Sequence, residues 1–327
     1  MKAPVLLCVF LASCGGGGGN TILTPPAYMP IIEIFATPPA PTAMLTSTDT
    51  LIVESSGAVQ GMLSKTQPVQ AVFFASDPVT KLITPTAAAD IASFLSAFKS
   101  ASRSDPASVF IMDEMLWDTN TAPSQSEIDA MSASMNQIIA LWRAQAPSVH
   151  LVVSIYPGLV VNPATSAQAI SLLRQVDTVI FKPYVLFDPP DYVFDRPSSG
   201  ALAWLYTDPE QALITTPCST PISGSMEYDL TACATALVPG VQVGLAYQAF
   251  LPLGYVGDSS YLAQLEHNWT TVHTLADLLE NQGRFYGSVV FGFNWAPGFA
   301  SGQSFMTPAM IAALKSALMI YQISPLY

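Results

Sequence analysis

The stretch SVFIMDE (residues 108–114) is an apolar run that ends in two adjacent acids. Further runs of this kind occupy residues 69–77, 149–158, 176–184, 241–250 and 287–298. Each is apolar at successive positions and rich in Val, Ile or Phe, which is typical of strands buried on both faces of a parallel sheet. The runs therefore predict the strands of one parallel sheet.

Segments with a helical pattern separate these runs. Residues 86–102 and 259–282 repeat apolar side chains at intervals of three and four. Ser124 and Glu127 form a capping-box pattern at the start of another helix. Such alternation of strand and helix predicts parallel pairing through right-handed crossovers.

Two weaker strand patterns, residues 30–38 and 50–57, bring the predicted set to eight. Eight strands in one domain over residues 30–327 fit a (β/α)8 barrel of the TIM type. The alternative is an open doubly wound α/β sheet. Neither GxGxxG nor GxxxxGK[ST] follows any strand, which argues against that alternative and against a nucleotide cofactor. In the barrel, residues 108–114 form the fourth strand and 176–184 the sixth.

The composition excludes some classes of partner. The net charge is −12, with 11 basic and 23 acidic residues and no basic cluster, so we expect no nucleic-acid partner. The His and Cys residues lack the spacing of a metal site, so we expect no metal.

The N-terminal MKAPVLLCVFLASC has one Lys and then a short apolar run, which predicts a signal peptide over residues 1–13. Leu11-Ala12-Ser13-Cys14 resembles the lipobox of bacterial lipoproteins, which implies cleavage before Cys14 and lipidation of that residue. Residues 14–29 would then be a lipidated, Gly-rich tether. By the same resemblance, Gly15 favours the outer membrane of the cell envelope. An ordinary secretory signal is the alternative.

Residues 186–238 interrupt the alternation of strand and helix patterns with a Pro-rich stretch after the sixth strand. We expect an insertion over the barrel mouth, where such segments often act as lids. Cys218 and Cys233 lie within it, and two cysteines in an exported chain most simply form a disulfide. A disulfide between Cys218 and Cys233 is therefore predicted to crosslink the insertion.

Polar and aromatic side chains gather where the predicted strands end. The carboxyl ends of barrel strands form the functional face, so these residues are the candidate site. Asp113, Glu114 and Asp118 are the candidate catalytic acids. The candidate substrate-binding residues are Glu54, Asp77, Tyr156, Lys182, Tyr184, Gln248, Asn294 and Trp295. Acids, amides and aromatics together suit a carbohydrate, whose cleavage uses two carboxyl groups.

This arrangement resembles that of barrel glycoside hydrolases. In their large retaining clan the fourth strand ends Asn-Glu, which matches Asp113-Glu114 and implies that Glu114 is the general acid. The seventh strand of that clan ends in the nucleophilic Glu, where this chain has Gln248, and an amide cannot take that role. Barrel hydrolases with several acids on the fourth strand and a Tyr on the sixth offer a second resemblance, through Asp113, Glu114 and Tyr184, although their spaced acidic signature is absent.

Side chains alternate along a regular strand, so Asp113 and Glu114 are expected to point opposite ways unless a bulge or turn intervenes. The leading hypothesis is a lipid-anchored envelope glycoside hydrolase that acts on an oligo- or polysaccharide. Glu114 would be its acid, and Asp113 or Asp118 its partner. A carbohydrate-binding barrel without catalysis is the first alternative, and an envelope scaffold the second.

Overall fold

The computed structural model describes residues 51–53, 69–77, 80–102, 106, 108–116, 124–163, 165–183, 226–248 and 259–291. The strands are β1 (Leu51–Val53), β2 (Val69–Val72), β3 (Ser108–Met112), β4 (His150–Ile155), β5 (Thr178–Phe181), β6 (Gln242–Gln248) and β7 (Phe285–Phe291). The helices are α2 (Ala87–Ser102), α3 (Gln125–Gln145), α4 (Pro157–Val161), α5 (Ser166–Leu173), α8 (Met226–Leu237) and α9 (Ser259–Asn281). The six clear strand predictions and the one at 50–57 are confirmed, whereas residues 30–38 lie outside the described residues.

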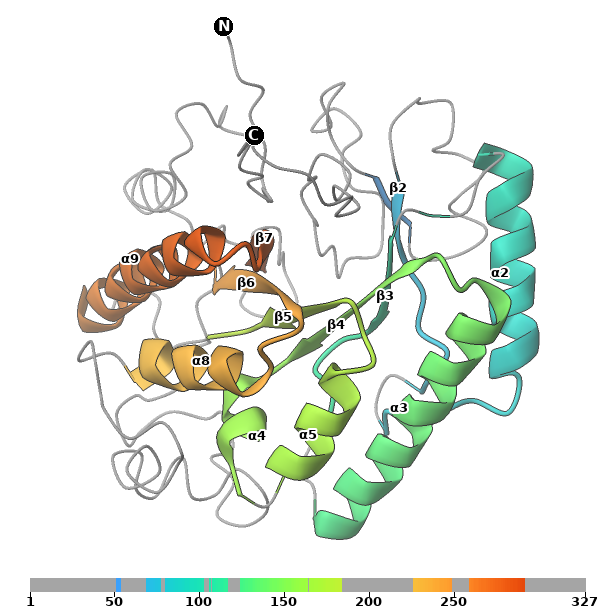
Figure 1. Ribbon diagram of the computed structural model, residues 1–327, viewed down its shortest axis with the longest axis horizontal. Coiled ribbons are helices and arrows are strands. Elements are labelled where there is room, and N and C mark those ends of the chain that lie inside the picture. Colours follow the sequence, from blue (N-terminus) through green and yellow to red (C-terminus); the bar gives the residue numbers. More distant parts are fainter. Residues whose placement is uncertain are drawn as a thin grey trace, which may run out of the picture.

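All neighbouring strands are parallel and follow chain order from β1 to β7. The helices succeed one another around the outside of the strands (Figure 1). A doubly wound sheet needs a point where the strand order reverses, and the described sheet has none, so that alternative is wrong. Parallel strands in unbroken chain order, with helices outside them, are the arrangement of a (β/α)8 barrel.

Alternate residues of each strand face two different environments. One set packs with the helices in a continuous apolar core, and includes Val109, Ile111, Val153, Ile155, Val179 and Phe181. The intervening Phe110, Val152 and Ile180 are also buried but lie outside that core. They form the inner face of the sheet, so both faces are covered, as the continuous apolar runs predict.

Contacts across the inner face show that the sheet is strongly curved. His150 of β4 stacks on Tyr286 of β7 with ring centroids 5.2 Å apart, although β5 and β6 separate the two strands. In a flat sheet three strand spacings would hold those backbones roughly 14 Å apart. His150 Nε2 also lies 2.7 Å from Thr178 Oγ1 on β5. The sheet therefore wraps around the face that carries His150, as a barrel requires.

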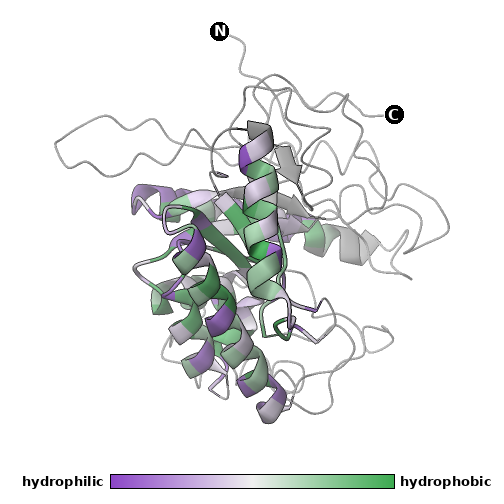
Figure 2. Cartoon of the chain, turned by 90° about the vertical axis from the view of Figure 1, so that its right-hand side faces the viewer, coloured by the Kyte–Doolittle hydropathy of each residue, from purple (hydrophilic) through white to green (hydrophobic). Residues whose placement is uncertain are grey.

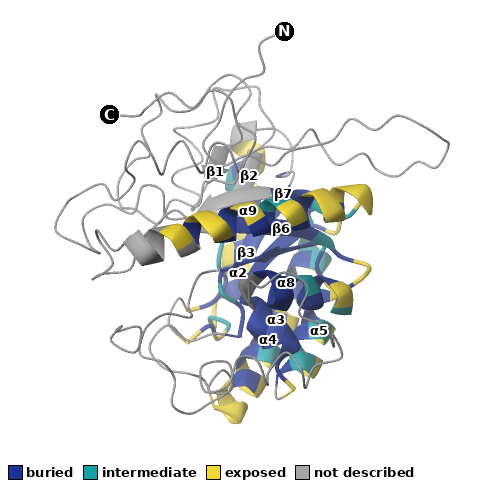
Figure 3. Cartoon of the chain, turned by 90° about the vertical axis from the view of Figure 1, so that its left-hand side faces the viewer, coloured by how far each residue is buried: buried dark blue, intermediate teal, exposed yellow. Residues whose placement is uncertain are grey.

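The helices show why the chain folds into two layers. Hydrophilic and hydrophobic residues alternate along them (Figure 2), and α9 buries one side while exposing the other (Figure 3). At the start of α3, the predicted capping box is present: Ser124 N donates to Glu127 Oε2 at 2.6 Å and Ser124 Oγ accepts from Glu127 N.

The predicted insertion is shorter than residues 186–238. Its last part forms α8, which lies between α4 and α9 in the outer layer and is an ordinary crossover helix. The segment 226–237 does carry apolar residues at helical spacing (Met226, Leu230, Cys233 and Leu237), but the prediction counted it as part of the Pro-rich insertion. Cys233 is buried on α8, whereas Cys218 lies outside the described residues, so their pairing stays a prediction.

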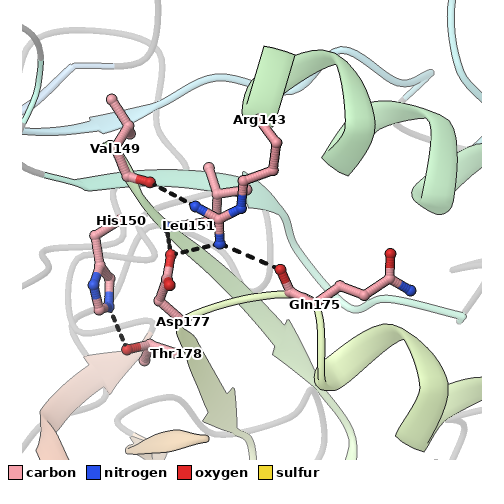
Figure 4. A network of polar contacts seen from close by, with 7 residues as sticks. All are labelled: Arg143, Val149, His150, Leu151, Gln175, Asp177 and Thr178. Atoms are coloured by element: carbon pink, nitrogen blue, oxygen red, sulfur yellow. Dashed lines mark hydrogen bonds and ion pairs between the residues drawn. The ribbon is translucent and has the colours of Figure 1, made fainter. Parts of the chain in front are cut away.

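Arg143 joins the amino ends of β4 and β5 (Figure 4). Its guanidinium donates to Val149 O at 3.1 Å, Gln175 O at 3.2 Å and Asp177 Oδ2 at 2.8 Å. The same Asp177 oxygen accepts from Leu151 N at 2.7 Å. This network lies at the end of the strands opposite Asp113 and Glu114, so its role is structural.

Replacing Asp177 with Ala is expected to lower the free energy of unfolding by about 1–3 kcal/mol, because Arg143 and the Leu151 amide lose a shared acceptor. Denaturant titration measures the change. Asp277→Ala is the matched control, since Asp277 is exposed and, among the described residues, is ion-paired only with His273 one turn away. Equal effects in the two variants would contradict a structural role for the network.

His150 predicts a pH dependence of stability. Burial lowers its pKa from the ordinary 6.5, opposed by Asp177 and assisted by Arg143. The unfolded chain thus binds more protons than the folded one as pH falls below about 6.5, so stability is lost there. We expect Tm to fall less between about pH 7 and pH 5 in His150→Phe, which keeps the ring against Tyr286, than in wild type. His273→Phe, at a surface position, should behave like wild type.

Candidate active site at the carboxyl ends of the strands

Asp113 and Glu114 follow β3 at a place where the strand is irregular. Phe110 pairs with Val152 but Met112 pairs with Val153, so Ile111 is an extra residue on β3. Directly afterwards Glu114 has φ 49 and Leu116 has φ 65, which turns the chain sharply. The bulge and the turn are the exception that the sequence analysis allowed for, so the alternation of a regular strand does not separate Asp113 from Glu114.

Both acids meet one ammonium. Lys182 follows β5, and its side chain is 1% exposed. Its Nζ is ion-paired with Asp113 Oδ1 and lies 3.6 Å from Glu114 Oε1. Because a buried ammonium without anionic partners is very unfavourable, the two carboxylates explain why a lysine is tolerated here. Lys182, a candidate substrate-binding residue, is thus engaged by the two acids.

Ser154 of β4 forms hydrogen bonds with the turn that follows the neighbouring strand β3. Its Oγ donates to Asp113 Oδ1 at 2.5 Å and accepts from Glu114 N at 2.8 Å. Its backbone O accepts from Met115 N at 2.9 Å. Ser154 lies near the end of a predicted strand and has the same inward alternation as Val152, but the sequence analysis gave it no catalytic or binding role. A small polar residue inside an apolar strand was the signal for it.

Lys81 is a second buried lysine near Glu114, and the sequence pattern gave no sign of it. It lies in the turn after β2, is 8% exposed and has φ 57. Asp77 organises this turn: Oδ1 accepts from Thr80 N at 2.8 Å and from Thr80 Oγ1 at 3.0 Å, and its backbone O accepts from Lys81 N. Asp77 was predicted to bind substrate. In the structure it is exposed, and its carboxylate accepts hydrogen bonds within this turn.

These surroundings set the proton affinity of Glu114. Burial raises the pKa of Glu114 above its usual 4.5, and this effect is larger than the opposing attraction of Lys182. The Asp113 carboxylate raises the pKa further, whereas Lys81 lowers it. The Glu114 side chain is still 26% exposed, so a ligand can reach it. A reachable carboxyl group whose pKa is raised is suited to general acid catalysis.

The remaining candidates are placed as follows. Tyr156 is buried in the helix-side core and precedes α4, which does not suit a sugar platform. Gln248 is the last residue of β6, at the same edge of the sheet as Lys182. Outside the described residues lie Glu54, Asp118, Tyr184, Asn294, Trp295 and the lipidation candidate Cys14.

Neither a metal cluster nor a membrane-spanning helix occurs within the described ranges. No group of three or more His, Cys, Asp or Glu residues there is arranged to hold a metal ion. None of the described helices combines the length and the apolar character needed to cross a bilayer.

No protein-family model matches the chain, and no curated protein matches its sequence. Solved structures with a similar fold include an intracellular xylanase from Thermoanaerobacterium saccharolyticum, with 10% identity, a TM-score of 0.48, and 83% of this chain aligned to 89% of that one. Xylanase A of P. fluorescens subsp. cellulosa has 13% identity and a TM-score of 0.44, over 79% and 81% of the chains. A Bacteroides uniformis beta-glucuronidase has 12% identity and a TM-score of 0.41, over 75% of this chain and 26% of that one. The fold assignment rests on strand order and inner-face contacts rather than on these likenesses.

Proposed function

We propose that the chain is a glycoside hydrolase with Glu114 as its general acid. The observation that carries the proposal is the position of Glu114 at the carboxyl end of β3, partly open, with a pKa raised by burial. Cleavage of a glycosidic bond needs a proton for the departing oxygen, and a carboxyl group of raised pKa supplies it. Asp113 fits a tuning role, because its oxygen is held by Ser154 and Lys182.

The second carboxylate is proposed to be Glu54 or Asp118. Gln248 ends β6 and has no carboxylate, and Asp77 is occupied in the turn before Lys81. Glu54 directly follows β1, and Asp118 lies four residues after Glu114. Replacing each in turn with the corresponding amide identifies the partner, since only the true partner gives a loss of turnover comparable to that of Glu114→Gln.

A carbohydrate-binding protein without catalysis is the second candidate, and Gln248 at the strand end favours it. The two functions differ in what happens to a bound glycan. The purified protein is incubated with a panel of neutral and acidic oligosaccharides, and products are measured by mass spectrometry alongside binding by calorimetry. New reducing ends support the hydrolase, whereas binding with all oligosaccharides intact supports the binding protein.

We further propose that lipid on Cys14 anchors the protein to the outer membrane of the cell envelope. The supporting pattern is Leu11-Ala12-Ser13-Cys14 after a short apolar run, followed by a Gly-rich tether. In bacteria fed a labelled fatty acid, the wild-type protein should carry the label and fractionate with membranes. Cys14→Ser should lose both properties, and a Cys14→Ser protein that still carries the label would contradict the anchor.

A further inference from the structure

Positive charge is concentrated around Glu114 in a chain that is otherwise strongly acidic. The chain has 11 basic residues and a net charge of −12, yet Lys81 and Lys182 are both buried and both lower the pKa of this one carboxyl group. The two lysines differ in their partners. Lys182 is ion-paired with Asp113 and Glu114, whereas the Lys81 side chain forms no ion pair or hydrogen bond with any residue in the described ranges.

Lys81 is also held in place by an ordered turn. Its amide donates to Asp77 O at 3.0 Å, and Asp77 N donates to Leu82 O at 2.8 Å, so the turn is closed on both sides. Its φ of 57 is an unfavourable backbone conformation for a residue with a side chain. A buried ammonium without a paired anion is unfavourable too. A binding partner for this ammonium would explain both features, because strain and desolvation are typical of groups kept for a ligand.

The charge of the proton-donating form of the site points to the same partner. When Glu114 holds its proton, the remaining charges are the Asp113 carboxylate and the two ammonium groups, so the cluster is net positive. The Asp113 carboxylate is ion-paired with Lys182 and accepts a hydrogen bond from Ser154. Lys81 is therefore the cation of this cluster that has no paired anion among the described residues. An acidic group on a bound molecule would supply an anion for the Lys81 ammonium.

We infer that this site takes an anionic oligosaccharide, one that carries a carboxylate, and that the Lys81 ammonium binds the carboxylate while Glu114 faces the scissile bond. The inference rests on the proposed hydrolase function for the role of Glu114, and on Lys81 alone for the choice of substrate. A sulfated sugar would present the same charge with a different geometry, and the test separates the two.

The test compares an oligouronate with its methyl ester, which keeps the sugar backbone and removes the charge, and with a sulfated oligosaccharide of equal length. Calorimetry with the full-length protein should show wild type binding the oligouronate roughly tenfold more tightly than the ester. Lys81→Gln should reduce that preference to less than about twofold, and Lys81→Arg should retain part of it. Lys99→Gln, an exposed lysine on α2, is the matched control and should keep the full preference.

Equal binding of the oligouronate and its ester by wild type would overturn the inference, as would an absence of binding to every charged oligosaccharide. A preference that survives in Lys81→Gln would overturn the role of Lys81. Tighter binding of the sulfated sugar would overturn the choice of a carboxylate. Because binding is the readout, an oligouronate that binds through Lys81 and is not cleaved refutes the hydrolase while leaving this inference standing.

Discussion

Glu114→Gln is expected to reduce kcat by about 10²–10⁴-fold while the protein stays folded, because the amide keeps the shape of the carboxyl group and cannot donate its proton. The measurement is the release of reducing ends from whichever oligosaccharide the wild type cleaves. Glu266→Gln is the matched control, since Glu266 is an exposed acid on α9 that lies outside the site. Unchanged hydrolysis by Glu114→Gln would remove Glu114 from the mechanism.

The same substitution is expected to leave stability unchanged or higher at neutral pH. The pKa of Glu114 is raised in the folded state, so the folded chain binds more protons than the unfolded one between the two pKa values. Its contribution to stability is therefore fully present below the unfolded value and is lost as pH rises through the folded one. Glutamine stays neutral throughout, so the Tm of the variant should exceed that of wild type by a margin that grows as pH rises. A variant that is less stable at every pH would show that ion pairing to Lys182 outweighs burial.

Local patterns along the chain were sufficient to predict the strands, the helices α2, α3 and α9, and the edge where the candidate residues lie, whereas α4, α5 and α8 were not predicted. Apolar runs of strand length, the capping box at Ser124 and the acids after residue 112 are all readable without knowing the neighbours. The shared environment of Asp113 and Glu114 could not be read in this way. It depends on the extra residue Ile111 in β3, which exists only relative to the register of β4.

The role of Ser154 and the burial of Lys81 could not be predicted for a related reason. Ser154 becomes important because its hydroxyl faces the turn after β3, a contact about forty residues away in sequence. Lys81 is an isolated lysine in a short turn, a pattern that usually indicates a solvent-exposed side chain. Its burial follows from the Asp77–Thr80 contacts and the positive φ of Lys81 itself. Function in this site thus depends on contacts between strands more than on any one motif.

Lys182→Met is expected to lower the free energy of unfolding by about 3–5 kcal/mol, because it leaves the buried Asp113 carboxylate without its charged partner. Methionine matches the length and apolar stem of lysine, so the change isolates the charge. Denaturant titration gives the loss, with Lys99→Met on the surface of α2 as the control. A loss similar to that of the control would mean that water or Ser154 alone is sufficient to stabilise Asp113.

A double variant separates the ion pair from packing. Asp113→Asn keeps an oxygen for Ser154 Oγ, so Lys182→Met with Asp113→Asn replaces the buried pair by neutral groups of similar shape. We expect the double variant to recover most of the stability lost in Lys182→Met, with a coupling of about 1–3 kcal/mol between the two sites. Additive losses would show that the two side chains act independently.

The folded double variant then tests whether the pair also tunes Glu114. Lys182 lowers the pKa of Glu114 and Asp113 raises it, and the lysine has the larger effect. Removing both charges should therefore raise the pKa of Glu114 further and move the basic limb of the pH dependence of kcat/KM to higher pH. If the limb stays in place while the protein is folded, the pair only stabilises the fold. If it moves upward, Lys182 and Asp113 set the pH range in which Glu114 acts as an acid.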